Sequence, residues 1–242
     1  MGLITEQRLP LNKALGIVFL FLVLGLPALA DLRAGQAAYD AEDYATALNE
    51  FLPLAQHGDA VAQLDLGWMY FSGRGVPQDS KEAVRWYRAA AEQGERHAQV
   101  SLGWLYKNGL GVPLDYTEAV RWYRAAAEQG EPNAQVNLGW MYDHGRGVPQ
   151  DYTEAVRWYR AAAEQGDSGG QVDLGRMYEN GLGVSQDYIQ AHMWFNLAAA
   201  SGDATAAKEA IKERDSIAGN MTPEQISEAK RLAREWKPKR NK

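Results

Sequence analysis

One unit of 36 residues occurs four times in succession without a gap, and this repetition limits the possible folds more than any other feature of the sequence. The four units occupy residues 59–94, 95–130, 131–166 and 167–202. The run Ala-Val-Arg-Trp-Tyr-Arg-Ala-Ala-Ala-Glu-Gln-Gly closes each of the first three units unchanged. A unit this short cannot bury a core alone, so neighbouring units must stack and share one. The sequence therefore predicts a repeat solenoid.

Each unit has the pattern of two helices. In the first helix, Ala62, Leu66, Met69 and Tyr70 fall on one side at about 100° per residue, which predicts a buried face. The second helix is expected to begin at an acidic N-cap with an acid or amide three residues later, the pattern of a capping box. These pairs are Asp79 and Glu82, Asp115 and Glu118, Asp151 and Glu154, and Asp187 and Gln190. Glycines able to adopt a left-handed conformation are expected to end the second helices: Gly94, Gly130, Gly166 and Gly202. We predict an all-α superhelix, a solenoid of stacked antiparallel helix pairs.

The segments beside the four units have the pattern of incomplete units. Residues 31–58 are predicted to form an N-terminal degenerate repeat that caps the solenoid. Residues 203–236 are predicted to hold C-terminal capping helices, a closing pair at 203–218 and 222–236, because a solenoid needs ends that face water. Residues 237–242 form a basic tail.

The first thirty residues have the pattern of a signal peptide. Arg8 and Lys13 precede an uncharged apolar run of 13 residues at 14–26, and small residues stand at the two positions of an Ala-x-Ala cleavage site that ends at Ala30. The alternative is an uncleaved anchor, but such a run spans only ~20 Å of the ~30 Å hydrocarbon core. We expect cleavage between Ala30 and Asp31, a periplasmic or secreted protein, and no stable membrane span after cleavage.

Charge and cysteine content exclude several classes of protein. The net charge is −6 and the sequence pI is about 5.3, with no strongly basic domain, so nucleic acid is not an expected partner. The chain has no cysteine, which excludes a disulfide framework, a thiol nucleophile and a thiolate zinc site. The four histidines, His57, His97, His144 and His192, show no ligand spacing, so neither a metal site nor a cofactor is expected.

Twelve or so positions recur at the same places in every unit. Read at 62–94, the pattern is Ala-x-x-x-Leu-Gly-x-x-Tyr-x-x-Gly-x-Gly-Val-x-x-Asp-x-x-x-Ala-x-x-Trp-Tyr-x-x-Ala-Ala-x-x-Gly. It closely resembles the Sel-one-like repeat (SLR), a relative of the tetratricopeptide repeat. The last unit departs most, with Gly170, Arg176, Ser185 and Phe195 in place of alanine, tryptophan, proline and tyrosine.

The resemblance implies a tetratricopeptide/SLR-type solenoid that works as a bacterial periplasmic or secreted adaptor. Such an adaptor would scaffold protein complexes in envelope assembly, signalling or host interaction. The resemblance carries no catalytic residues with it, so an enzyme is not expected.

Positions opposite the buried face of the first helix are expected to line the concave groove, as they do in tetratricopeptide-type stacking. They form a ladder of Trp68, Trp104, Trp140 and Arg176, flanked by Asp65, Ser101, Asn137 and Asp173 and by Phe71, Lys107, Asp143 and Glu179. Aromatic residues and arginine carry most interface energy, so this ladder is the candidate site for a protein or peptide partner. The alternative is that the tryptophans pack between neighbouring units, because large aromatic residues at helical spacing are usually core.

Other recurring residues are assigned structural roles. Trp86, Trp122, Trp158 and Trp194 are expected in the core. Arg85 and Arg88 of the first unit, and the arginines at the same places in the next two units, are expected on the convex face. There they would be solvated or paired with neighbouring glutamates. The Gly-x-Gly loops, the first of them Gly73-Arg74-Gly75, are explained by turn geometry rather than by phosphate binding.

Three functions from different classes fit this pattern to different degrees. The first is an exported scaffold that binds a protein or peptide in the groove as a monomer. The second is a self-associating structural module whose groove receives the tail of another copy. The third, a cell-wall hydrolase, lacks convergent acid, base or nucleophile residues.

Overall fold

Residues 30–239 are described by a computed structural model of the chain. Residues 1–29 and 240–242 lie outside the described residues, and with them the predicted signal peptide and the end of the basic tail. Within residues 30–239 the chain forms helices and no strand. The helices are α1 (Leu32–Asp40), α2 (Tyr44–Gln56), α3 (Ala60–Ser72), α4 (Ser80–Glu92), α5 (Arg96–Asn108), α6 (Tyr116–Glu128), α7 (Pro132–His144), α8 (Tyr152–Glu164), α9 (Ser168–Asn180), α10 (Tyr188–Ala199), α11 (Ala204–Ala218) and α12 (Pro223–Glu235).

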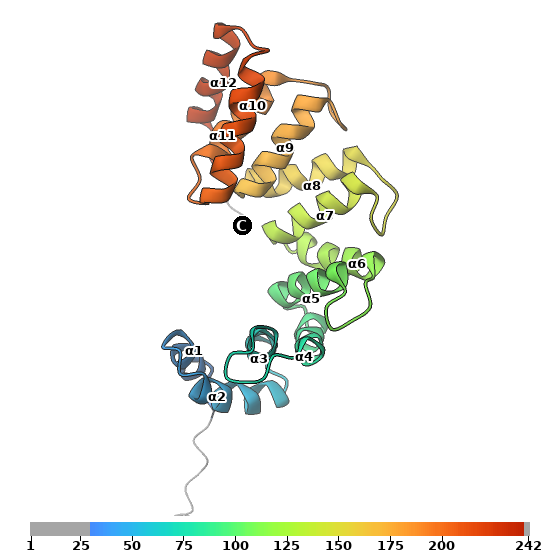
Figure 1. Cartoon of the computed structure of the whole chain (residues 1–242), viewed down its shortest axis with the longest axis vertical. Helices are drawn as coiled ribbons and strands as arrows, with labels where there is room; N and C mark the ends of the chain where they lie inside the picture. The colour runs from blue at the N-terminus through green and yellow to red at the C-terminus, as the bar shows by residue number, and fades with distance from the viewer. Residues whose placement is uncertain (1–29, 240–242) are drawn as a thin grey trace, which may run out of the picture.

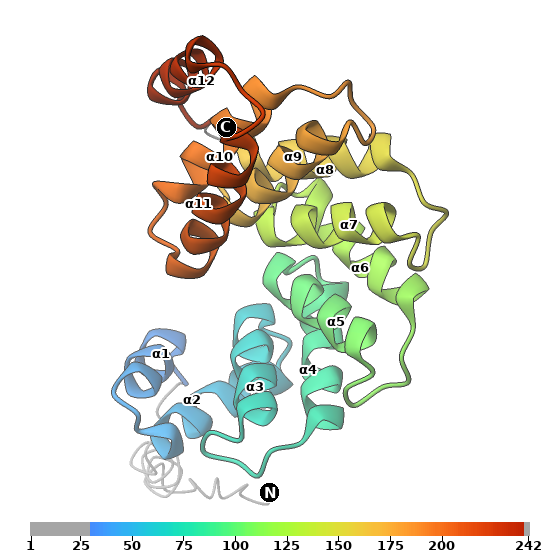
Figure 2. The ribbon, with the colours of Figure 1, turned by 45° about the horizontal axis from the view of Figure 1, so that its top comes forward.

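From α1 to α11, consecutive helices pack against each other along a crescent (Figure 1). The odd-numbered helices α1 to α11 follow its inner side and the even-numbered helices its outer side, so α1 and α11 face each other across the opening (Figure 2). The predicted all-α solenoid is confirmed. None of the described helices has both the length and the apolar character needed to cross a membrane.

The interior is continuous because each unit places a tryptophan in the unit before it. Trp122 is only 6% exposed and packs with Ala83, Val84 and Tyr87 of the preceding unit. Trp86, Trp158 and Trp194 occupy the matching places in their clusters. The prediction that these four residues are core is confirmed.

A glycine in the first helix of each unit lets that helix approach its partner. A methyl group at Gly139 would lie 2.7 Å from two ring carbons of Tyr159. Gly67, Gly103 and Gly175 meet the rings of Tyr87, Tyr123 and Phe195 in the same way. The close contact offsets the ~1 kcal/mol that a glycine costs inside a helix relative to alanine.

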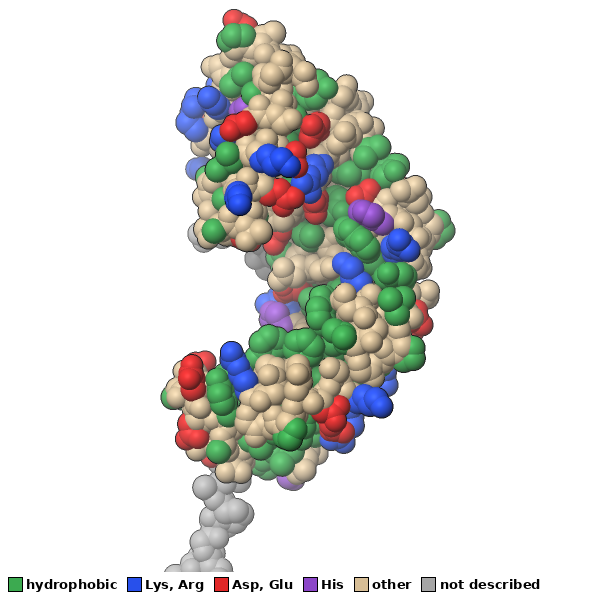
Figure 3. Space-filling view, in the orientation of Figure 1, with side chains coloured by type: hydrophobic (Ala, Val, Ile, Leu, Met, Phe, Trp, Pro, Cys, Tyr) green, Lys and Arg blue, Asp and Glu red, His purple; other side chains and the backbone are tan. Residues whose placement is uncertain are grey.

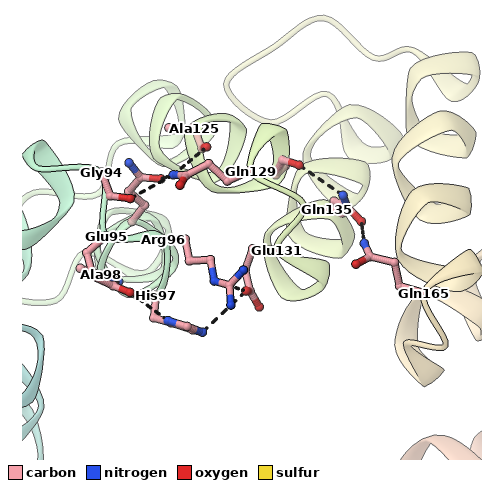
Figure 4. A network of polar contacts seen from close by, with 12 residues as sticks. Gly94, Glu95, Arg96, His97, Ala98, Ala125, Gln129, Glu131, Gln135 and Gln165 are labelled. Carbon is pink, nitrogen blue, oxygen red and sulfur yellow. Dashed lines mark hydrogen bonds and ion pairs between the residues drawn. The ribbon is translucent and has the colours of Figure 1, made fainter. Parts of the chain in front are cut away.

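Buried glutamines connect neighbouring units. Gln99 donates to the carbonyl of Ala91 at 3.1 Å and accepts from the side chain of Gln129 at 2.9 Å. Gln135 and Gln165 repeat this contact at 2.8 Å (Figure 4). In the last unit Ser201 replaces the second glutamine, and the buried Oε1 of Gln171 has no hydrogen-bond partner. The bond to the earlier carbonyl therefore joins two units, and the glutamine pair joins the two helices within one unit.

The second helices have acidic N-caps, but the predicted capping boxes are wrong for them. Asp115 accepts from the N–H groups of Thr117 at 2.9 Å and Glu118 at 3.0 Å. The reciprocal bond from Glu118 cannot form, because the N–H of Asp115 already donates to the carbonyl of Tyr106 at 3.0 Å. Among the helices of residues 30–239, only α12 has both bonds of a capping box, between Thr222 and Gln225.

Left-handed glycines end three of the second helices as predicted. The φ angles are 91° at Gly94, 85° at Gly130 and 95° at Gly166. Gly202 is an exception: its φ is not positive, because α10 already ends at Ala199 with Ala200 as its C-cap.

The Gly-x-Gly loops are turns, as expected. Gly111 has a φ of 72°, and a methyl group there would lie 2.2 Å from the carbonyl oxygen of Ser80 in the preceding unit.

The arginines of the second helices have two different environments. Arg85, Arg121 and Arg157 are exposed and pair with Glu82, Glu118 and Glu154 at 2.9, 3.3 and 2.9 Å, as expected of a convex face. The same expectation is wrong for the other set. Arg124 is half-buried and donates to the hydroxyl of Tyr142 in the next unit at 2.7 Å. Arg88 and Arg160 bind Tyr106 and Tyr178 in the same way.

The two ends of the solenoid are built differently. At the N-terminal end, α1 packs on α2 with Phe51 and Ala55 in the core. At the other end, α11 and α12 do not form the predicted closing pair, because both pack against α10. Trp236 meets Trp194 edge to face with 6.0 Å between ring centroids, and Lys239 binds Glu164 at 2.7 Å. The start of the tail thus lies against α8 and α10.

Candidate partner-binding groove

The inner helices carry a row of aromatic side chains at the surface. Trp68 on α3 is 46% exposed and Trp104 on α5 is 41% exposed, while Trp140 on α7 is half-buried. The structure thus places Trp68 and Trp104 outside the interior shared by neighbouring units. The indole N–H of Trp68 donates to the hydroxyl of Tyr39 on α1 at 2.7 Å, which fixes the first ring.

The first aromatic residues enclose a pocket of about 290 Å³. Phe71 lies between the two tryptophans, with its ring centroid 5.9 Å from that of Trp68 and 5.6 Å from that of Trp104. The other lining residues are Tyr87, Val100, Ser101, Leu105 and Asn137. The walls are mostly apolar, and none of the lining residues is charged. A pocket of this size and character suits one or two apolar side chains of a partner.

Lys107 stands at the side of the pocket toward α7. Its Nζ lies 4.0 Å from the ring centroid of Trp140 and donates to Oδ1 of Asn137 at 3.3 Å. Partial burial lowers the pKa of Lys107. His144 also stacks on Trp140, with 4.4 Å between the ring centroids. The ammonium group of Lys107 is therefore held against the ring of Trp140 by a cation–π contact.

Arg176 does not continue the aromatic row as a free side chain. Its guanidinium binds Glu209 at 2.5 Å and Glu213 at 2.8 Å on α11, and it lies 3.6 Å from Asp173. Burial raises the pKa of Asp173 to about 6, against the opposing effect of Arg176. Figure 3 shows the change in character, with hydrophobic side chains gathered over α5 and α7 and charged side chains between α9 and α11.

The remaining predicted site residues also lie on the inner helices, partly buried. Asp65 accepts from Gln36 of α1 at 3.4 Å, and burial raises its pKa to about 6. Asp143 lies 3.6 Å from His144. Burial and the nearby Glu213 raise the pKa of Glu179. The twelve predicted residues thus form two groups along one surface. Nine lie over α3 to α7, where the aromatic residues are, and Asp173, Arg176 and Glu179 lie on α9, where α11 adds Glu209 and Glu213.

Sequence reasoning missed residues at both ends of this surface. Glu209 stands 36 residues after Asp173, so extending the period beyond residue 202 would have found it. Tyr39 could not have been found in this way. Its unit has a connection of three residues, 41–43, where complete units have seven, as at 73–79, so the period does not hold there.

The described residues show no arrangement that could hold a metal ion through three histidine, aspartate or glutamate side chains. His97 contacts Glu95 at 2.9 Å and Glu131 at 3.7 Å, and Arg96 also reaches Glu131, at 3.4 Å (Figure 4). These contacts join the starts of α5 and α7. The contacts of Arg96 and His97 with Glu131 cross from one unit to the next, as the bond from Gln99 to the carbonyl of Ala91 does.

Comparison with known proteins identifies the repeat. The Sel1 repeat model matches four times, at residues 60–95, 96–131, 132–167 and 168–203. A Sel1 repeat protein from Oxalobacter formigenes is 32% identical, with a TM-score of 0.68 over 81% of this chain and 88% of its own. The antigen c5321 of uropathogenic Escherichia coli, which displays an SLR fold, is also 32% identical, with a TM-score of 0.51 over 84% of this chain and 52% of its own.

A more distant structure shows the fold alone. The immunity protein Pa5087 from Pseudomonas aeruginosa is 19% identical, with a TM-score of 0.51 over 86% of this chain and 83% of its own. No curated protein matches the chain in sequence. Four consecutive matches cover more than half of the chain, and the helices they describe stack as the repeat requires. The chain belongs to the Sel1 repeat family.

Proposed function

We propose that the chain is an exported scaffold that binds a protein or peptide partner in its concave groove. Sel1 repeat proteins are generally non-enzymatic scaffolds for protein–protein interaction. The observation that carries the groove assignment is the pocket formed by Trp68, Phe71 and Trp104, where large aromatic side chains remain exposed on the inner surface. On a folded protein, an exposed cluster of large aromatic side chains usually marks a binding surface.

Affinity capture with substituted chains tests the groove. The tagged chain is compared with a Trp68→Ala/Trp104→Ala variant and with a Leu114→Ala control. Leu114 is 56% exposed but lies outside the pocket lining, so its loss removes apolar surface elsewhere. We expect the double variant to lose its partners, the control to retain them, and both to keep the helical circular dichroism of the parent. Retention of every partner by the double variant would show that the groove assignment is wrong.

Export is part of the same proposal. The sequence at 1–30 has a signal peptide pattern, and the start of the fold fits cleavage after Ala30. Asp31 caps α1, accepting from the N–H of Arg33 at 2.9 Å, and its own nitrogen lies 2.7 Å from Oε2 of Glu50. Cleavage would make that nitrogen an ammonium next to a carboxylate. The N-terminal residue of the protein recovered from the cell exterior or periplasm should be Asp31, and recovery of chains that retain residues 14–26 would count against export by cleavage.

We also propose that the groove is not filled by the tail of another copy. Trp236 and Lys239, at the start of the tail, are bound to Trp194 and Glu164 of their own chain. Sedimentation over a range of concentrations should therefore give a monomer, whereas a concentration-dependent dimer that is lost on removal of residues 236–242 would support the self-associating alternative.

A further inference from the structure

We infer that the groove selects a protein segment with a large apolar side chain at one end and basic residues at the other. This inference rests on the proposed groove function and adds the chemistry of the partner. Two observations carry it, the apolar pocket over α3 and α5 and the excess of carboxylates over α9 and α11. The two ends of one continuous inner surface therefore prefer different side chains.

The apolar end has no carboxylate in its wall. Its lining is aromatic, aliphatic and neutral polar, and Lys107, which binds the lining residue Asn137, is turned onto the ring of Trp140. An aromatic or large aliphatic side chain gains most here, because it would stack on the rings of Trp68, Phe71 and Trp104 and displace water from them.

At the other end, carboxylates gather around one guanidinium. Arg176 is shared among Asp173, Glu209 and Glu213. Glu179, one turn after Arg176 on α9, interacts with both Glu213 and Arg176 and makes no ion pair within residues 30–239. The exposed Lys208 and Lys212 of α11 form no ion pair with any of these carboxylates in the described part of the chain. A lysine or arginine of a partner would reduce the repulsion among the carboxylates. A phosphate backbone or an acidic segment would increase it, so the partner is a basic protein segment.

The distance between the two ends sets the spacing in the partner. Trp104 on α5 and Asp173 on α9 stand two units apart, roughly 20 Å if neighbouring inner helices pack ~10 Å apart. An extended chain covers ~3.3 Å per residue, so the basic residues should lie about six residues from the apolar anchor. A helical segment would need about twice as many residues for the same distance.

Labelled peptides of known sequence test the charge preference. The basic probe is Trp-Gly-Ser-Gly-Ser-Gly-Lys-Lys-Lys, the acidic probe has Glu in place of Lys, and a third probe has Gly in place of Trp. Each is made in both chain directions with blocked ends. Fluorescence anisotropy with the purified chain should show one direction of the basic probe binding about tenfold more tightly than its acidic counterpart at ~0.1 M salt. The difference should shrink at ~0.5 M salt, and replacing Trp should weaken binding.

Three variants connect the preference to the two ends. Glu179→Gln should weaken the basic probe about threefold and should leave the acidic probe bound at least as tightly as before, because one repelling charge is removed. Trp104→Ala should weaken both probes that contain Trp. Glu118→Gln, on an outer helix, is the matched control and should change neither. Circular dichroism of each variant shows that the fold is kept.

The outcomes separate this inference from the function on which it rests. Equal or tighter binding of the acidic probe, or no binding of the basic probe in either direction, overturns the inference. It leaves the proposed function standing if Trp68→Ala/Trp104→Ala still abolishes capture of partners. Binding of the basic probe that survives both Trp104→Ala and Glu179→Gln overturns the inference as well, because the contact then lies elsewhere.

Discussion

The first three units each have two tryptophans, which have opposite roles because they lie on helices with different neighbours. Trp122 on α6 is 6% exposed and fills the space between two units, whereas Trp104 on α5 is 41% exposed on the inner surface. The residue type and the helical spacing are the same. Burial therefore separates a residue that stabilises the fold from one that is available to a partner.

Replacing Trp122 with alanine should lower the free energy of unfolding by about 3–5 kcal/mol, because a large cavity is left between two units. Urea unfolding followed by circular dichroism measures the loss. The matched control is Trp104→Ala, which should cost at most about 1.5 kcal/mol because much of that side chain is already in water. Equal losses in the two variants would contradict the assignment of separate roles.

The carboxyl of Asp65 should make stability depend on pH. Burial raises its pKa in the folded chain to about 6, above the ordinary value of 3.8. The folded state thus binds the proton more tightly, so the stabilisation is complete below about pH 4 and is lost as the pH rises through about 6. Asp65→Asn does not titrate and keeps an acceptor for Gln36. The variant should unfold at higher urea than the parent at about pH 7.5, and this advantage should disappear near pH 4. An advantage of the same size at both pH values would contradict the prediction.

Each complete unit joins two helices through a loop that satisfies polar groups in both. The N–H of Asp115 donates back to Tyr106 of the first helix, and its carboxylate accepts from the first turn of the second. One residue therefore ends the loop and starts a helix. Glu118 lies three residues later. In the described part of the chain, its carboxylate forms a hydrogen bond and an ion pair with the exposed side chain of Arg121 and with no other residue.

Asp115→Ala should destabilise the chain by about 1 kcal/mol, because two N–H groups of α6 lose their acceptor. Glu118→Ala should cost about 0.5 kcal/mol or less, since it removes one exposed ion pair and no capping bond. The midpoints of urea unfolding compare the two. A loss on Glu118→Ala that matches the loss on Asp115→Ala would show that a capping box forms after all.

The whole molecule is a stack of equivalent joints between two unlike ends. Residues 119–130 and 155–166 are identical, so the joint before residue 131 and the joint before residue 167 have the same side chains on the side that comes first in the chain. Trp158 and Trp194 occupy equivalent places in successive joints. A middle unit is therefore dispensable for stacking, although it contributes surface to the groove.

Deleting residues 131–166 should give a shorter chain that is still folded, because Trp194 would then pack where Trp158 does now. The helical circular dichroism per residue should be unchanged and the sedimentation coefficient should fall in line with the smaller mass. Deleting only residues 131–148, which removes α7 and the first part of the loop after it, is the control and should abolish cooperative unfolding. A collapsed or unfolded product from the full-unit deletion would contradict the additive picture.

The sequence alone determined the repeat, the paired helices and the buried tryptophans. These follow from local rules, in which a 36-residue period repeats the same turns, N-caps and apolar faces in every complete unit. It also placed the groove candidates on helices that follow the inner side of the crescent. The reciprocal capping bond does not form, because the N–H of Asp115 that it needs already donates to the carbonyl of Tyr106, earlier in the chain.

The tertiary structure decided what happens where the period ends. Arg176 has the position of a groove tryptophan, but α11 brings Glu209 and Glu213 to it and makes this end of the surface acidic. Tyr39 binds Trp68 from a shorter unit, and Trp236 covers Trp194 from a helix that follows no repeat. A period specifies contacts only between equivalent units. Contacts with the unlike ends depend on how far each end helix reaches in space, which the fold settles and the repeat pattern does not.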